Sequence, residues 1–195
     1  HPLSVLIHTV GHGALTPPEL LTVLGQPGVG AVADVRRYPG SRRHPHFARG
    51  AMEKWLPDAG VAYRWVEALG GRRRAARASP NVGLRNEQFR GYADHMRSLA
   101  FVDAVADLLA FARECPVAVL CAEAPWWNCH RRLLADHLVL VEGVTVEHLL
   151  HDGRSAPHAP TPSARLDGGL VVYDAGDQPA LFGADTAEGS GAPAP

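Results

Sequence analysis

The stretch from Leu120 to Arg132 contains the side chains best suited to chemistry in this 195-residue chain. Cys121 closes an apolar run typical of a strand, and we expect the helix that follows to begin at Asn128. A thiol between a strand end and a helix amino terminus has a lowered pKa when the helix dipole and nearby guanidinium groups stabilise the thiolate. We therefore expect Cys121 to act as a nucleophile and Glu123 as a general base. The alternative for Cys121 is a buried thiol that only packs.

Further residues of this stretch are candidates for contacting a substrate or phosphate. They are Trp126, Trp127, Cys129, His130 and Arg131. A cation is unfavourable at the positive end of a helix, so Arg131 in the first turn indicates an anionic partner, either Glu123 or a bound anion. The two tryptophans are suited to stacking on nucleobases.

Zinc is the competing interpretation of this stretch, because Cys121, Cys129 and His130 are all zinc-ligand types. They do not form the paired, short-spaced motif of a zinc site, so we expect no metal and no cofactor. The pattern of Cys, five residues and Arg typical of phosphatases also fails, because position 127 is Trp.

A second candidate cluster runs from Asp34 to Phe47 and is rich in Arg, His and aromatic residues. Asp34 ends a predicted strand, where it can pair with Arg36 or Arg42 and share acid–base work with a second carboxylate. We expect Arg36, Arg42, Arg43 and, from an earlier loop, His12 to contact phosphate or substrate. A solvated, salt-bridged loop is the alternative for the cluster.

Strands alternate with helices along the chain, which predicts an α/β fold. We expect strands at 5–10, 29–35, 61–66, 117–121 and 144–150, and helices after Thr16, at 47–59, over 86–114 in one or two pieces, and from 128 to about 141. This order favours a single domain with a mainly parallel sheet flanked by helices on both faces. Ligands bind such sheets at the carboxyl ends of the strands. We therefore expect Asp34, Arg36, Cys121, Glu123 and Arg131 to line one pocket.

The α/β domain is predicted to cover residues 1–154, and residues 155–195 a Pro/Gly-rich acidic tail. Within that tail we expect an edge strand at 170–174 and disorder at 188–195. Residues 70–82 are expected to form a mobile basic loop. Between residues 36 and 90 the chain carries thirteen basic and four acidic side chains, although its formal net charge is −1. Such a basic segment can attract a polyanion; an Arg-rich genome composition is the alternative explanation.

Three cysteines in a chain of this size argue against a disulfide framework and for a reducing compartment, so we expect a cytoplasmic protein. No apolar run reaches the roughly 18 residues that span a bilayer, so we expect no membrane partner.

Taken together, these pieces resemble the bacterial family called domain of unknown function 488. The matching pieces are Thr9-Val10-Gly11-His12, Asp34-Val35-Arg36 with Pro39 and Ser41-Arg42, Phe47, Leu69-Gly70-Gly71, Cys121-Ala122-Glu123, Cys129-His130-Arg131 and Val146-Glu147-His148-Leu149. The resemblance spans about residues 5–150 and implies an α/β fold with a shared polar site. The family usually has Ser where this chain has Gly13, and it implies no particular reaction.

Three functions remain open from the sequence. The first is an enzyme that processes nucleic acid or nucleotides, in DNA repair or base modification, as a hydrolase or glycosylase. The second is a thiol-dependent enzyme on a small anionic substrate, with Cys121 as nucleophile and arginines holding the anion. The third is a non-catalytic nucleic-acid-binding module. The expected partner is thus a nucleic acid or a small anion.

Overall fold

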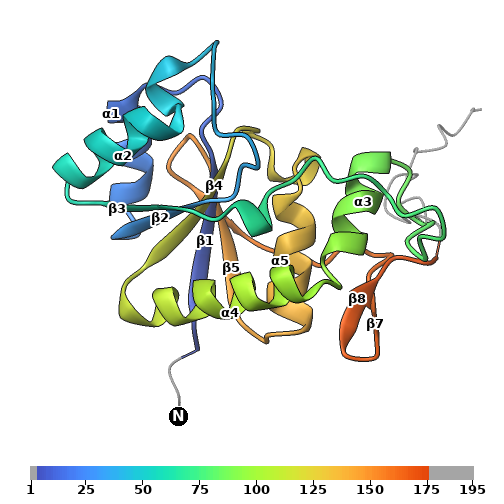
Figure 1. Cartoon of the computed structure of the whole chain (residues 1–195). Helices are drawn as coiled ribbons and strands as arrows, with labels where there is room; N and C mark the ends of the chain where they lie inside the picture. Colours follow the sequence, from blue (N-terminus) through green and yellow to red (C-terminus); the bar gives the residue numbers. More distant parts are fainter. Residues whose placement is uncertain (1–3, 176–195) are drawn as a thin grey trace, which may run out of the picture.

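Short apolar segments of the chain form the central sheet. The computed structural model describes residues 4–175, and its six-stranded sheet has the order β3-β2-β4-β1-β5-β6 (Figure 1). The parallel strands are β1 (Leu6–Gly11), β2 (Ala31–Asp34), β3 (Ala62–Trp65), β4 (Val117–Cys121) and β5 (Thr145–Leu149). The short strand β6 (Ser155–Pro157) pairs with β5 in the antiparallel direction. The α/β class with a mainly parallel sheet is therefore confirmed.

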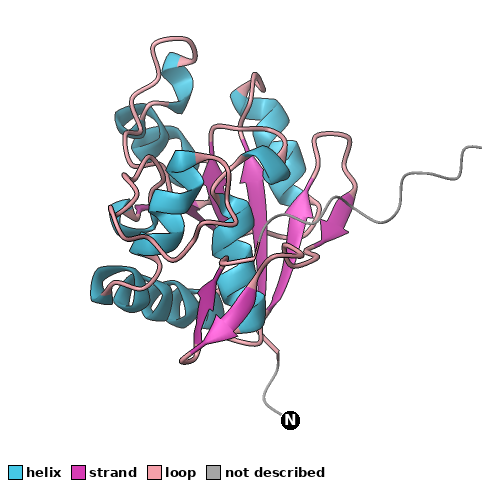
Figure 2. Ribbon diagram, turned by 90° about the vertical axis from the view of Figure 1, so that its right-hand side faces the viewer, coloured by secondary structure: helices cyan, strands magenta, loops and turns pink. Residues whose placement is uncertain are grey.

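Helices cover both faces of the sheet (Figures 1 and 2). Helices α1 (Pro17–Gly25) and α2 (Arg49–Asp58) pack on one face, and α3 (Glu87–His95), α4 (Leu99–Glu114) and α5 (Arg131–Leu140) pack on the other. Side chains of β4 alternate between the faces, so that Val119 and Cys121 join the core beneath α3–α5 while Ala118 and Leu120 join the core beneath α1 and α2. Cys121 therefore points toward the α5 side.

The helices begin at residues that can cap them. Thr16 and Glu19 form the capping box at the start of α1. Asn86 caps α3 and Ser98 caps α4, so the stretch 86–114 forms two helices rather than one.

The start of α5 differs from its prediction. Asn128 belongs to the short 3-10 helix η3 (Trp126–Asn128), and α5 begins at Arg131 without a side-chain cap. Cys129 lies between them in extended backbone conformation, and its Sγ accepts a hydrogen bond from the backbone N–H of Arg131 at 3.5 Å. The thiol of Cys129 thus occupies the place that we expected an asparagine cap to fill.

Residues 155–175 continue the folded structure. After β6 the chain forms a separate two-stranded antiparallel sheet of β7 (Arg165–Asp167) and β8 (Leu170–Val172), so the edge strand expected at 170–174 is present at Leu170–Val172, in a small sheet of its own. Val171 and Tyr173 are buried in the core beneath α3–α5. The predicted disordered end, 188–195, lies outside the described residues.

Residues 70–82 form no helix or strand, but side-chain contacts anchor them. Asp94 of α3 accepts hydrogen bonds from the backbone N–H of Ala76, the hydroxyl of Ser79 and the side-chain amide of Asn81. In the part of the chain that the structure describes, no helix is both long and apolar enough to cross a membrane.

Candidate functional site

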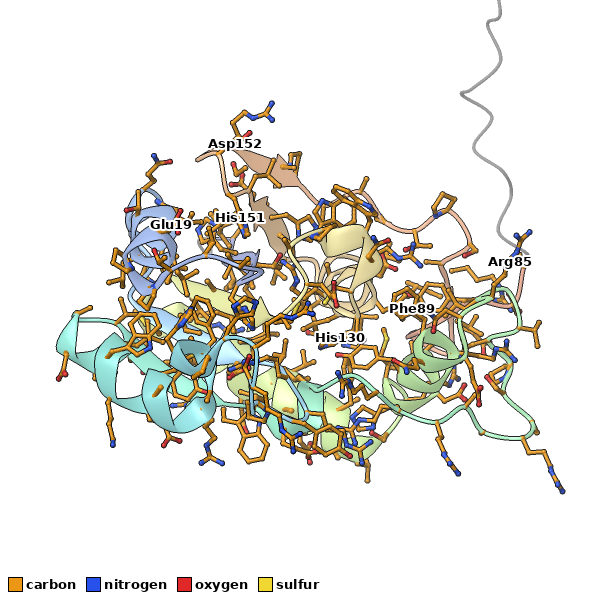
Figure 3. The ribbon with its side chains drawn as sticks, turned by 90° about the horizontal axis from the view of Figure 1, so that it is seen from above. Glu19, Arg85, Phe89, His130, His151 and Asp152 are labelled. Atoms are coloured by element: carbon orange, nitrogen blue, oxygen red, sulfur yellow. The ribbon has the colours of Figure 1, made fainter. Side chains whose placement is uncertain are left out.

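A cavity of about 370 Å³ opens at the carboxyl ends of β2 and β4. Its lining comes from segments far apart in the sequence: Arg36, Arg37, Tyr38, Gly71, Arg72, Gln88, Phe89, Cys121, Ala122, Glu123, Asn128, Cys129 and His130. Seen from above, His130 lies near the middle of the molecule and Phe89 of α3 lies to its right (Figure 3). This is the place where open parallel sheets bind ligands.

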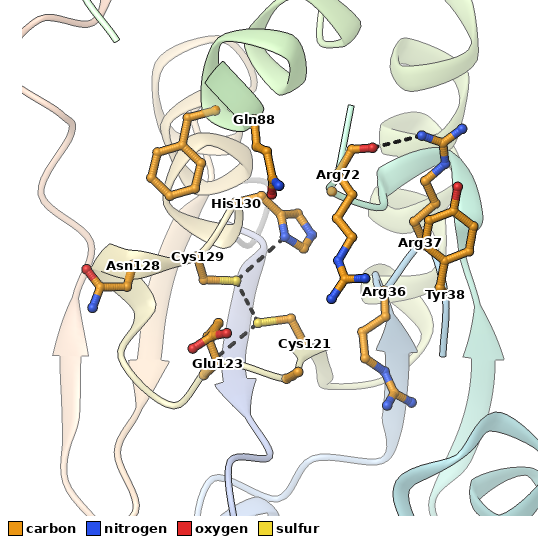
Figure 4. Close-up of a pocket in the computed structure, with 13 residues that line it drawn as sticks. Arg36, Arg37, Tyr38, Arg72, Gln88, Cys121, Glu123, Asn128, Cys129 and His130 are labelled. Carbon is orange, nitrogen blue, oxygen red and sulfur yellow. Dashed lines mark hydrogen bonds between the residues drawn. The ribbon is translucent and has the colours of Figure 1, made fainter. Parts of the chain in front are cut away.

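Two thiols meet at the wall of this cavity. The Sγ atoms of Cys121 and Cys129 are 2.7 Å apart, and both residues are almost fully buried, at 2% and 3% exposed (Figure 4). Cys129 Sγ also lies 3.6 Å from Nδ1 of His130. The carbonyl of Val35 accepts a hydrogen bond from His130 Nε2 at 2.9 Å, so in the neutral ring Nε2 carries the proton and Nδ1 is free to accept one. The thiol proton of Cys129 therefore has an acceptor within the site.

The pKa values of the two thiols are shifted in opposite directions. Burial alone raises the pKa of Cys129, but the hydrogen bond from Cys121, the contact with His130 and the charge of Arg131 together lower it well below the ordinary value. Burial, the hydrogen bond to Cys129 and the charge of Cys129 raise the pKa of Cys121 well above the ordinary value. Cys129 is thus the thiolate and Cys121 is the thiol that donates to it.

A buried cation lies beside this thiolate. Arg131 is 1% exposed, and its guanidinium donates to the hydroxyl of Thr9 at 3.0 Å and to the backbone carbonyls of Glu123 and Ala124 at 2.6 Å and 3.2 Å. Within residues 4–175 no carboxylate pairs with it. Since a buried charge without a counter-charge is unfavourable, the Cys129 thiolate is the anion that balances Arg131. The partner expected from the sequence, Glu123, contributes its carbonyl instead of its carboxylate.

Two glycines let the segments of the site approach each other. A Cβ on Gly11, the last residue of β1, would lie 1.7 Å from the carbonyl oxygen of Glu123 and 2.8 Å from the guanidinium of Arg131. A Cβ on Gly71 would lie 2.8 Å from Nδ1 of His130. These contacts explain why the chain needs glycine where β1 meets the β4–α5 loop and where the 70–82 segment passes the histidine.

The cation that faces the thiols is Arg72, which the sequence reasoning missed. Arg72 has a φ of 57°, and it is the one non-glycine residue with positive φ among those described. Its carbonyl accepts a hydrogen bond from Arg37 at 2.9 Å, while its guanidinium has no hydrogen bond or ion pair within residues 4–175. In Figure 4 that guanidinium points into the cavity toward Cys121 and His130. Backbone strain of this kind gathers at functional sites, and it is the signal that singles out Arg72.

The prediction that five residues line one pocket holds for Arg36, Cys121 and Glu123 and is wrong for Asp34 and Arg131. The side-chain alternation of β2 places Asp34 on the α1–α2 face, where it is fully buried and pairs with Arg36 at 2.7 Å. Arg131 lies beneath the cavity wall. In Figure 4 the guanidinium of Arg36 points away from the thiols. Asp34 therefore positions Arg36, and its carboxylate does not reach the cavity.

Of the remaining predicted binding residues, Cys129 and His130 line the cavity, and the others do not. Nε2 of His12 lies 3.4 Å from NH1 of Arg36, and burial lowers the pKa of His12 to about 4, so this ring is a neutral acceptor. Arg42 and Arg43 are exposed on the 40–44 loop.

The two tryptophans also lie outside the cavity lining. Trp126 stacks flat on His148, with ring centroids 4.2 Å apart, and Trp127 is half exposed. His148 thus already covers one face of the Trp126 ring, which we expected to stack on a nucleobase.

Behind the cavity, a buried chain of hydrogen bonds begins at Arg131 and ends at a carboxylate. Thr9 accepts from Arg131 and donates to Nδ1 of His148 at 2.6 Å. Nε2 of His148 then donates to Nδ1 of His158 at 2.9 Å, and Nε2 of His158 donates to Asp136 at 2.8 Å. Burial and the charges of His158 and Arg131 lower the pKa of His148 to about 3, so the ring is neutral as this chain requires.

Metal ligation has no candidate site among the described residues, because no group of three or more His, Cys, Asp or Glu side chains converges there. Cys121, Cys129 and His130 contact one another in a row rather than surrounding a common point.

The fold and the site define an α/β protein with a thiol pair at the carboxyl edge of its parallel sheet. A family model described as domain of unknown function DUF488 matches residues 16–138, and the chain belongs to this family. The matched range includes both cysteines of the site, Arg72 and Arg131, while β1 and β5 lie outside it. Comparison with curated proteins gave no match, and comparison with solved structures gave none either.

Proposed function

We propose that the protein is a thiol-dependent enzyme that acts on a small anionic substrate, with the Cys129 thiolate as its nucleophile. One observation carries the proposal: Cys129 lies at the wall of a cavity, 3.6 Å from His130, and the unpaired guanidinium of Arg72 points into the same cavity. A thiolate stabilised by a histidine and by a helix amino terminus is typical of nucleophilic cysteines.

The cavity itself favours a small anion. Its volume of about 370 Å³ lies at the lower end of the range that holds small ligands. A bound anion would supply the partner that Arg72 lacks within the described residues, through a charge-assisted hydrogen bond. Glu123 also lines the cavity, and its exposed carboxylate is a second group able to accept a proton.

We infer the reaction from the positions of these groups. The Cys129 thiolate, whose proton Nδ1 of His130 has already taken up, attacks the electrophilic atom of the anion held by Arg72. His130 then returns the proton to the leaving group. Cys129 takes the role predicted for Cys121, because Cys129 alone of the two thiols contacts both His130 and the amino terminus of α5.

Alkylation of Cys129 tests this function. In a Cys115→Ser background, the rate of alkylation by anionic iodoacetate and neutral iodoacetamide is followed against pH, and the modified residue is identified by peptide mass spectrometry. We expect Cys129 to react as a thiolate well below the pH of about 8.5 at which a free cysteine ionises. Arg72→Gln should slow iodoacetate about tenfold and leave iodoacetamide unchanged.

Arg74→Gln is the matched control, because Arg74 is exposed in the same segment and does not line the cavity. A Cys129 that titrates like a free thiol would refute the proposal. Equal effects of the Arg72 and Arg74 substitutions would refute the role of Arg72 in holding the anion.

A nucleic-acid substrate, processed in DNA repair or base modification by a hydrolase or glycosylase, is the second candidate. A shallow groove lined by Arg37, Tyr38, Arg49 and Trp65 shares its first two residues with the cavity, and Tyr38 is 61% exposed. Exposed aromatic rings beside arginines suit single-stranded nucleic acid. An oligonucleotide that protects Cys129 from iodoacetamide at low salt would favour this candidate, and absence of protection would exclude it.

A further inference from the structure

We propose that Cys121 and Cys129 form a two-electron redox pair that exchanges with a small anionic disulfide, in which Cys129 attacks the disulfide and Cys121 resolves the product. This inference rests on the proposed function, because it takes Cys129 as the nucleophile, and it adds the substrate class and the role of the second thiol.

The distance between the thiols carries the inference. Their Sγ atoms lie 2.7 Å apart, so about 0.7 Å of movement brings them to the disulfide bond length of about 2.05 Å. One thiol ends β4 and the other precedes α5, and Arg131 holds the intervening loop through the carbonyls of Glu123 and Ala124. The backbone thus keeps the thiols together, and both line the cavity that a substrate would enter.

The exchange balances with the groups present. The Cys129 thiolate attacks one sulfur of the substrate disulfide; the sulfur–sulfur bond of the substrate breaks, and the first substrate thiolate leaves with the proton held by His130. Cys121 then loses its proton to the second substrate sulfur, attacks Sγ of Cys129 and expels that sulfur as a thiol. The substrate gains two electrons and two protons, and the cysteine pair loses them.

The buried charge of Arg131 favours the reduced form of the pair. The reduced pair contains the Cys129 thiolate that balances this guanidinium, whereas a Cys121–Cys129 disulfide is neutral and leaves the guanidinium without a counter-charge. A reduced form stabilised in this way makes the disulfide easy to reduce. The pair therefore fits reversible exchange rather than a permanent structural bridge.

The third cysteine provides the control. Cys115 precedes Pro116 at the amino end of β4, whereas Cys121 is at its carboxyl end, so the strand separates Cys115 from the site by roughly 20 Å. Cys115→Ser therefore gives a background in which every remaining thiol belongs to the pair.

The experiment treats this background with oxidised glutathione, which is anionic, and reads the products by intact and peptide mass spectrometry after quenching with acid. We expect loss of two hydrogen atoms, with Cys121 and Cys129 joined. Adding Cys121→Ser should trap one glutathionyl group on Cys129, and adding Cys129→Ser should leave Cys121 unmodified. Arg72→Gln should slow the reaction of oxidised glutathione about tenfold and not that of the neutral disulfide of 2-mercaptoethanol.

Three results would overturn the inference. A stable glutathionyl group on Cys129 with Cys121 free would show that Cys121 does not resolve it. No reaction with either disulfide, together with rapid alkylation of Cys129 by iodoacetate, would exclude disulfide substrates while leaving the proposed function intact. Attack by Cys121 in the Cys129→Ser variant would reverse the two roles.

Discussion

At the scale of single residues, the thiol of Cys129 and the guanidinium of Arg131 depend on each other. The charge of Arg131 lowers the pKa of Cys129, and the thiolate supplies the negative charge that no carboxylate provides to Arg131 among the described residues. Removing either partner therefore leaves the other as a buried, unbalanced charge, which lowers the free energy of unfolding.

This dependence predicts a coupling that can be measured. Cys129→Ser and Arg131→Met should each lower the free energy of unfolding, and the double variant should lower it by less than the two effects together. We expect a coupling of about 2 kcal/mol from urea unfolding at a pH where Cys129 is ionised. Cys115→Ser combined with Arg131→Met is the control pair and should be additive. Additive effects for Cys129 and Arg131 would show that the thiolate does not balance the guanidinium.

At the scale of elements, the site depends on how closely the β4–α5 loop crosses the end of β1. Gly11 lies under the carbonyl of Glu123, and that carbonyl in turn accepts from Arg131. This one glycine therefore controls how closely the loop that carries Cys129 approaches the strand ends of β1 and β4.

Gly11→Ala should push this loop away from β1. We expect a loss of about 3 kcal/mol in the free energy of unfolding, because the added methyl group meets backbone atoms that cannot move independently. The same change should slow alkylation of Cys129. Gly50→Ala in α2 is the control, because a Cβ there meets no atom within 4 Å, and it should be neutral or stabilising by about 0.5 kcal/mol. Equal free energies of unfolding for the Gly11→Ala and Gly50→Ala variants, measured with urea, would contradict the prediction.

The sequence predicted the elements best where local signals are strong. The apolar strands β1, β2 and β4 and the capping box of α1 were found because burial and capping leave patterns in adjacent residues. The start of α5 was missed because Cys129, and no standard capping residue, accepts the hydrogen bond from its first backbone N–H, that of Arg131. The strand β8 was predicted, but its partner β7 was not, because nothing in a short strand specifies which strand it pairs with.

The sequence predicted where the site lies, but it did not predict how the charged side chains Arg72 and Arg131 are arranged there. Strand ends identified Cys121, Glu123 and Arg36, because parallel sheets bring such ends to one edge. The direction in which Arg72 points and the isolation of Arg131 from carboxylates both depend on tertiary packing. No pattern of residue spacing in the sequence predicts either the direction of Arg72 or the absence, among the described residues, of a carboxylate beside Arg131.

At the scale of the whole molecule, buried neutral histidines make the fold sensitive to acid. The pKa of His12 is lowered to about 4 and that of His148 to about 3, in both cases mainly by burial. Burial also lowers the pKa values of His8, His95 and His137. In an unfolded chain, these rings bind protons near pH 6.5.

Stability should therefore fall as the pH drops below about 6.5, because the unfolded chain takes up protons that the folded chain excludes. Each of His12 and His148 contributes up to about 1.4 kcal/mol per pH unit until the pH reaches its folded-state pKa. Urea unfolding between about pH 7.5 and about pH 5 measures this slope. His12→Gln should flatten it, whereas the exposed Asp103→Asn should not. A stability independent of pH over this range would contradict the prediction.

The strand order also determines when the chain can assemble during synthesis. Strand β1 pairs only with β4 and β5 among the described strands, and β2 reaches β1 only through β4. Until the ribosome has released β4, the first strand has no neighbour in the sheet, and the cavity wall is incomplete until residues 122–130 follow. The cysteine pair therefore acquires its ionised thiol only in the completed domain, and nascent chains carry three ordinary cysteines.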